Sequence, residues 1–144
     1  MEKLQYALDL FWDDMVGTVE QIDENVYSIA FYTLIDSHWD CIEVYLEKIT
    51  DYNYQITDGG NIISDLEMYG FNMTNKEDIA RIKDILMPPI LFDVKEKEFY
   101  AVVDTREDDG EGFEDLKKFM FKVYSFARTM SFIHQHFYYL KKKF

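Results

Sequence analysis

The strongest pattern in the sequence is a strict 3-4-3-4 spacing of large apolar residues near the C-terminus. Eight residues form this stripe: Leu116, Phe119, Val123, Phe126, Met130, Ile133, Phe137 and Leu140. The spacing matches the period of an α-helix with one continuous apolar face, and neither Gly nor Pro interrupts it. Glu114 and Asp115 precede the stripe and Lys141 follows it, so the charges at both ends favour the helix dipole. We therefore expect a long helix over residues 113–143.

Upstream of this helix, short apolar and β-branched runs alternate with turn residues and predict an antiparallel sheet. Five strands are expected, over residues 26–34, 39–49, 54–56, 90–94 and 99–104. The clearest is the second, in which Ile42, Val44 and Leu46 alternate with acidic residues and so indicate a strand with one buried face.

Three further helices are expected outside the strands. Leu4, Leu8, Phe11 and Met15 have helical spacing and predict an N-terminal helix that ends near Gly17. A short helix follows the glycine pair after residue 58, and a second one begins at the capping-box pattern of residues 74–77. The order of elements lacks the alternation of a parallel sheet, so we expect one α+β domain over residues 1–144, with the sheet within residues 26–104.

The charge of the chain is distributed very unevenly. The net charge is −13, but residues 116–144 hold seven basic residues and no acid. This leaves 8 basic and 28 acidic residues, a net charge of −20, to residues 1–115. A body of this charge repels nucleic acid and anionic membranes, although the Lys-rich C-terminus could contact either one. The alternative is that the basic helix only neutralises its own acidic domain.

The central block of the chain resembles a known family. The features are the acidic loop from Asp36 to Asp40, the turn Thr57-Asp58-Gly59-Gly60, and the helical segment Asp65-Leu66-Glu67. Together they resemble the domain-of-unknown-function 1828 family of bacteria and mobile elements, over about residues 26–104. The usual Thr-Pro before the acidic loop is replaced here by Tyr32-Thr33. The resemblance implies a domain type but no catalytic residues.

The motifs for common chemistries are absent or weak. His134 and His136 diverge by about 200° on a helix, and Cys41 and His38 lie at a turn, so no metal site or cofactor is expected. Glycine loops for phosphate and nucleophile elbows are also absent. A divergent metal-dependent nuclease or other hydrolase, with Asp58, Asp93 and Lys95, is kept as the alternative function, although such acid–Lys pairs occur at the frequency expected by chance.

The favoured function is a non-enzymatic interaction protein whose acidic surface binds a basic surface of another macromolecule, as nucleic-acid mimics of phages and mobile elements do. The expected partner-binding residues are acidic: Asp36, Asp40, Asp58, Glu107, Asp108, Asp109 and Glu111. Turn propensity explains the first three of these equally well, because Asp satisfies backbone groups in turns.

Aromatic residues outside the apolar stripe suggest a second interface. These residues are Phe121, Tyr124, Phe132, Tyr138 and Tyr139. One sheet cannot cover both sides of a long helix, so we expect a homodimer that packs through them. The single Cys41 excludes an internal disulfide and favours the cytoplasm, and the sequence has neither an apolar leader nor a membrane span.

Overall fold

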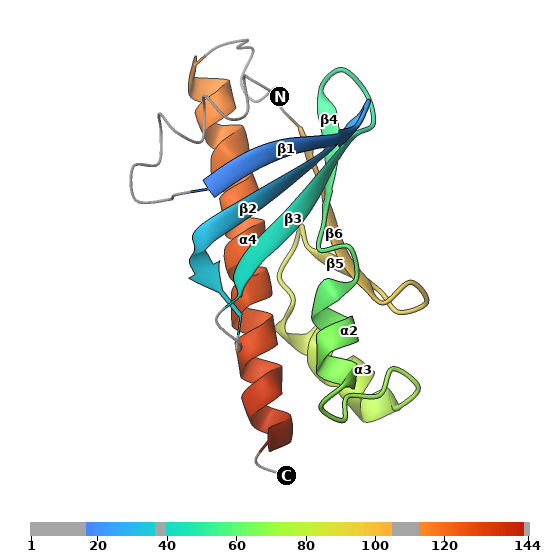
Figure 1. Ribbon diagram of the computed structural model, residues 1–144. Helices are drawn as coiled ribbons and strands as arrows, with labels where there is room; N and C mark the ends of the chain where they lie inside the picture. Colours follow the sequence, from blue (N-terminus) through green and yellow to red (C-terminus); the bar gives the residue numbers. More distant parts are fainter. Residues whose placement is uncertain (1–16, 37–39, 105–112, 143–144) are drawn as a thin grey trace.

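The computed structural model describes residues 17–36, 40–104 and 113–142, which form one α+β domain (Figure 1). The strands are β1 (Gly17–Asp23), β2 (Val26–Ile35), β3 (Cys41–Lys48), β4 (Asn53–Thr57), β5 (Leu91–Asp93) and β6 (Glu98–Asp104). The helices are α2 (Asn61–Glu67), α3 (Lys76–Ile85) and α4 (Phe113–Lys142). None of these described helices is long and apolar enough to cross a membrane.

The six strands form a single antiparallel sheet in the order β1-β2-β3-β4-β6-β5. Its register places Ile29 opposite Val44, and Leu46 opposite Ile56, which in turn lies opposite Ala101. Because paired residues share one face of a sheet, these buried side chains form a continuous apolar surface. The alternation expected within residues 39–49 is confirmed, because Ile42, Val44 and Leu46 of β3 are buried while Glu43 and Glu47 are exposed.

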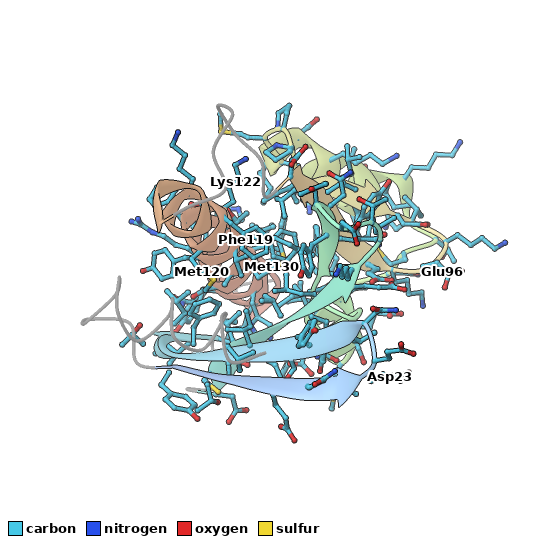
Figure 2. All side chains as sticks on the ribbon, turned by 90° about the horizontal axis from the view of Figure 1, so that it is seen from above. Asp23, Glu96, Phe119, Met120, Lys122 and Met130 are labelled. Carbon is cyan, nitrogen blue, oxygen red and sulfur yellow. The ribbon has the colours of Figure 1, made fainter. Side chains whose placement is uncertain are left out.

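Helix α4 lies across this apolar surface (Figure 1). Its stripe residues from Phe119 to Phe137 are at most 2% exposed, which confirms the packing expected from the 3-4-3-4 spacing. Figure 2 shows Phe119 and Met130 directed from α4 towards the sheet. At 30 residues the helix is about 45 Å long, so it extends past the sheet to contact α2.

The sheet has six strands instead of the expected five. The additional one is β1, where only Gly17 and Val19 are buried, so its sequence lacks the alternation that marks a strand with one buried face. Residues 18–20 pair with residues 28–30 of β2 at the edge of the sheet. The expected N-terminal helix lies outside the described residues.

The capping box expected at residues 74–77 is wrong in its details. Asn75 is the N-cap of α3, and its side-chain oxygen accepts hydrogen bonds from the backbone N–H groups of Glu77 and Asp78. The Thr74 hydroxyl instead donates to the side chain of Asn72. Asn and Thr both cap helices well, so the sequence did not distinguish two adjacent candidates.

Candidate functional site

The face of the sheet opposite α4 is open in the part of the chain that the structure describes (Figures 1 and 2). Exposed Glu43 and Glu47 of β3 point to this side, because Val44 and Leu46 between them point into the core. Glu20 of β1 shares the same face through the row Glu20–Ser28–Tyr45. We call the surface around Glu20, Glu43 and Glu47 the open face.

The open face is strongly acidic. The six described strands contain seven acidic residues and a single basic one, Lys48, at the end of β3. Because Lys48 directly follows Glu47 in the strand, its side chain points to the other side of the sheet, away from the open face. Its Nζ atom lies 3.9 Å from Oδ1 of Asp51. Half-buried Tyr45 lies between Glu43 and Glu47 on β3, and half-buried Tyr100 lies in the same row across Thr57 of β4. The surface thus combines negative charge with aromatic rings, which is suited to Lys and Arg side chains.

A polar cavity of about 220 Å³ opens at one end of the sheet. Strand β4 ends at Thr57 opposite Tyr45, so the first residues of β3 have no strand on that side. Helix α2 fills part of this gap. Four acidic residues are among those that line the cavity: Asp36, Glu43, Asp58 and Asp65.

Asp58 holds the turn between β4 and α2. It is 1% exposed, and its carboxylate accepts backbone N–H bonds from Gly60 (3.1 Å), Ile62 (3.1 Å) and Phe99 (2.9 Å). Burial, with a smaller contribution from the charge of Glu98, raises the pKa of Asp58 to about 6, although the three N–H donors act in the opposite direction. The carboxylate is therefore committed to the turn and does not reach the surface.

The two glycines after Asp58 are required by the same turn. Gly59 and Gly60 have φ angles of +67° and +79°, which other residues rarely adopt. A Cβ atom on Gly59 would lie 2.8 Å from the ring of Tyr45. The Thr-Asp-Gly-Gly motif is thus explained by backbone geometry.

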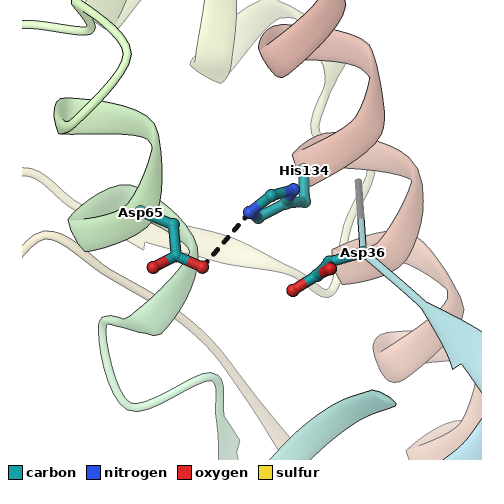
Figure 3. Close-up of side chains that lie close together, drawn as sticks. All are labelled: Asp36, Asp65 and His134. Atoms are coloured by element: carbon teal, nitrogen blue, oxygen red, sulfur yellow. Dashed lines mark hydrogen bonds and ion pairs between the residues drawn. The ribbon is translucent and has the colours of Figure 1, made fainter. Parts of the chain in front are cut away.

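Three side chains from separate elements meet at the edge of the cavity (Figure 3). Asp36 follows β2, Asp65 belongs to α2, and His134 belongs to α4; one nitrogen or oxygen atom from each lies within 4.8 Å of the others. The Nε2 atom of His134 is 3.3 Å from Oδ2 of Asp65. The His134 side chain is 1% exposed and that of Asp65 is 45% exposed. Two carboxylates and one imidazole are a set of groups that can bind a metal ion.

Hydrogen bonds fix the position of this group. The carbonyl of Ile35 accepts bonds from the hydroxyl of Ser131 and, at 2.9 Å, from the side-chain amide of Gln135. The end of β2 is thereby held against α4, and the next residue, Asp36, lies beside His134. In the sequence, His134 was weighed as a ligand only with its neighbour His136, and Asp65 was named only as part of the family motif.

A comparison with protein families identifies the central part of the chain. The family model described as "Domain of unknown function DUF1828" matches residues 33–123, more than half of the sequence. The chain belongs to the DUF1828 family. The match begins later and extends further than the expected residues 26–104, and it includes Asp36 and Asp65 but not His134. No curated protein and no solved structure matches the chain.

The other acidic candidates in this DUF1828 chain occupy turns. Exposed Asp40 donates its backbone N–H to Asp36 at 3.2 Å and accepts from the backbone of Asp36 at 2.9 Å. Asp93 accepts the backbone N–H of Glu96 at 3.1 Å in the β5–β6 hairpin, which also contains exposed Lys95. Both carboxylates thus accept backbone N–H bonds: that of Asp93 within its hairpin, and that of Asp58 within its turn and from Phe99 of β6. Glu107, Asp108, Asp109 and Glu111 lie outside the described residues.

The aromatic residues expected at a dimer interface divide into two groups. Phe121, Phe132 and Tyr139 are 52–58% exposed. Tyr124 and Tyr138 are half-buried within the fold, where their rings contact those of Phe31 and Tyr69 at centroid distances of 5.7 and 4.8 Å. Only the first group is available for a second copy of the chain.

Proposed function

We propose that this DUF1828 protein is a non-enzymatic interaction protein that binds a basic surface of another macromolecule through its open face. The observation that carries the proposal is the charge of that face: Glu20, Glu43 and Glu47 are exposed on it, and the only basic residue of the described strands points away. Opposite charge on the partner would speed the encounter and select the orientation of binding.

The spacing of the carboxylates favours a folded, Arg-rich or Lys-rich partner. Glu43 and Glu47 are four residues apart on one strand, which corresponds to about 13 Å, and β1 lies about 10 Å from β3. At these separations each carboxylate can pair with a different basic side chain. Tyr45 and Tyr100 offer rings on which guanidinium groups can stack.

A surface with this charge suits the groove of a nucleic-acid-binding protein. The protein would thus act as a nucleic-acid mimic. It would do so in the cytoplasm, in the mobile-element setting that the family resemblance implied. Cys41, the only cysteine, is a free thiol, which is compatible with a reducing compartment.

Two variants of equal charge test the proposal. The face variant carries Glu20→Gln, Glu43→Gln and Glu47→Gln. The control variant carries Glu77→Gln, Asp84→Asn and Glu96→Gln, which are exposed on α3 and the β5–β6 hairpin. Each variant has a net charge of −10, so a difference between them reports the position of the charges and not their number.

Tagged protein is incubated with bacterial lysate at low salt, and the captured partner is then purified and titrated with each variant. We expect at least a tenfold loss of affinity for the face variant, little change for the control, and competition by double-stranded DNA. Equal losses in both variants, or binding that is insensitive to salt and DNA, would contradict the proposal.

A further inference from the structure

We propose that Asp36, Asp65 and His134 form a binding site for a divalent transition-metal ion, with Zn²⁺ as the best match. The inference does not rest on the proposed function, because its ligands lie at the cavity and not on the open face. Asp36, which the sequence pattern suggested as a partner-binding residue, would bind the ion instead.

The separation of His134 and Asp65 agrees with metal coordination. Two ligands of a tetrahedral ion with bonds of about 2.0–2.1 Å lie about 3.3 Å from each other. The Nε2 atom of His134 and the Oδ2 atom of Asp65 are 3.3 Å apart. A hydrogen bond between imidazole and carboxylate is usually shorter, about 2.7–2.9 Å when charged. Without an ion the two side chains form a long hydrogen bond (Figure 3), and the same separation fits two corners of a tetrahedral coordination sphere.

The third ligand completes the site with a small movement. The selected atoms of Asp36, Asp65 and His134 all lie within 4.8 Å of one another, so tetrahedral coordination requires the Asp36 carboxylate, whose Oδ1 accepts the backbone N–H of Asp40, to move closer by up to about 2 Å. Aspartate makes such a shift by rotating its side chain. His134 is rigid by comparison, because it is buried in the contact between α4 and α2 (Figure 3).

Charge and space both favour a divalent ion. As ligands of an ion, two carboxylates and an imidazole together carry a charge of −2, which one Zn²⁺ ion cancels. Glu43 and Asp58 are further acidic residues around the cavity. Imidazole is a ligand typical of zinc and of other transition metals, whereas Mg²⁺ prefers oxygen ligands and retains its water. The cavity of about 220 Å³ beside Asp36 and Asp65 has room for a water molecule at the fourth position.

The ion would connect three elements that are distant in sequence. Asp36 ends β2, Asp65 lies on α2, and His134 lies on the last third of α4. A bound ion should therefore stabilise the contact of α4 with the rest of the domain, by binding only the folded state.

Metal binding to the full chain tests the inference. Zn²⁺ is titrated by calorimetry, and Co²⁺ is used as a substitute because its tetrahedral complexes absorb visible light strongly. We expect one equivalent of Zn²⁺ per chain, a higher melting temperature with Zn²⁺, and a tetrahedral Co²⁺ spectrum. Mg²⁺ should produce none of these effects.

The variants His134→Gln and Asp65→Asn should each weaken Zn²⁺ binding at least tenfold and remove the Co²⁺ spectrum. Matched controls are His136→Gln, which changes an exposed histidine two residues away, and Asp40→Asn, which changes an exposed aspartate near Asp36. Both controls should bind as the unmodified chain does. Because Asp65 is partly exposed, Asp65→Asn should keep its circular dichroism even if His134→Gln unfolds. Absence of a 1:1 complex, or equal loss in the controls, would overturn the inference.

Discussion

The buried carboxylate of Asp58 should make the stability of the fold depend on pH. Burial raises the pKa of Asp58 from 3.8 to about 6. In the unfolded chain the group returns to its ordinary value, so the folded state binds a proton more tightly. The resulting stabilisation is complete below about pH 4 and is lost as the pH rises through 6.

The size of the effect follows from the two pKa values. At pH 8 the carboxyl is ionised in both states and contributes no difference. At pH 5 it is mostly protonated in the folded state and mostly ionised in the unfolded state, which stabilises the fold by about 1.4 kcal/mol relative to pH 8. Relief of repulsion among the other carboxylates should act in the same direction.

The variant Asp58→Asn isolates the contribution of this one group. The amide of the asparagine does not titrate. Its NH₂ group is a donor and would face a backbone N–H group that donates to the carboxylate in the unmodified chain. We therefore expect the free energy of unfolding to fall by about 1–3 kcal/mol at pH 8. Urea unfolding at pH 5, 6, 7 and 8 provides the free energies. The difference between the two proteins should grow by about 1.4 kcal/mol from pH 8 to pH 5, and parallel pH profiles would refute the reasoning.

Three further predictions concern local packing and assembly. Gly59→Ala should cost at least 1 kcal/mol more than Gly70→Ala in urea unfolding, because both have positive φ but only the former places a Cβ 2.8 Å from a tyrosine ring. Asn75→Ala, which removes the N-cap of α3, should cost about 1 kcal/mol in the same assay. Light scattering should give a molecular mass of twice 17.3 kDa for the unmodified chain. The double variant Phe132→Asp and Tyr139→Asp should give folded monomers, because both side chains are exposed on α4. A monomeric mass for the unmodified chain would contradict the dimer.

The sequence predicted most of the fold where burial is periodic. The stripe on α4 and the alternation in β3 are each repeated over several residues, and both describe the observed core. Strand β1 escaped detection because an edge strand has few buried positions and thus no clear period. The start of α3 was misplaced by one residue because Thr74 and Asn75 can both cap a helix.

The candidate site was less accessible to prediction. The position of the open face depends on which side of the sheet α4 covers. The spacing of residues along a strand shows only that one face is apolar and the other polar. Asp65 and His134 are 69 residues apart, so only the packing of α2 against α4 brings them together. Asp58 was recognisable in the sequence as part of a motif. Its carboxylate, however, accepts hydrogen bonds from three backbone N–H groups, and one of these belongs to a residue 41 positions away in the chain.

The most direct test of the central claim is to measure which carboxylates the partner covers. The captured partner is mixed with the chain, exposed carboxylates are coupled to a small amine by carbodiimide, and peptides are quantified by mass spectrometry. We predict that coupling at Glu20, Glu43 and Glu47 falls several-fold in the complex, while Glu77 and Asp84 react as in the free chain. Unchanged coupling on the open face, with protection elsewhere, would contradict the account.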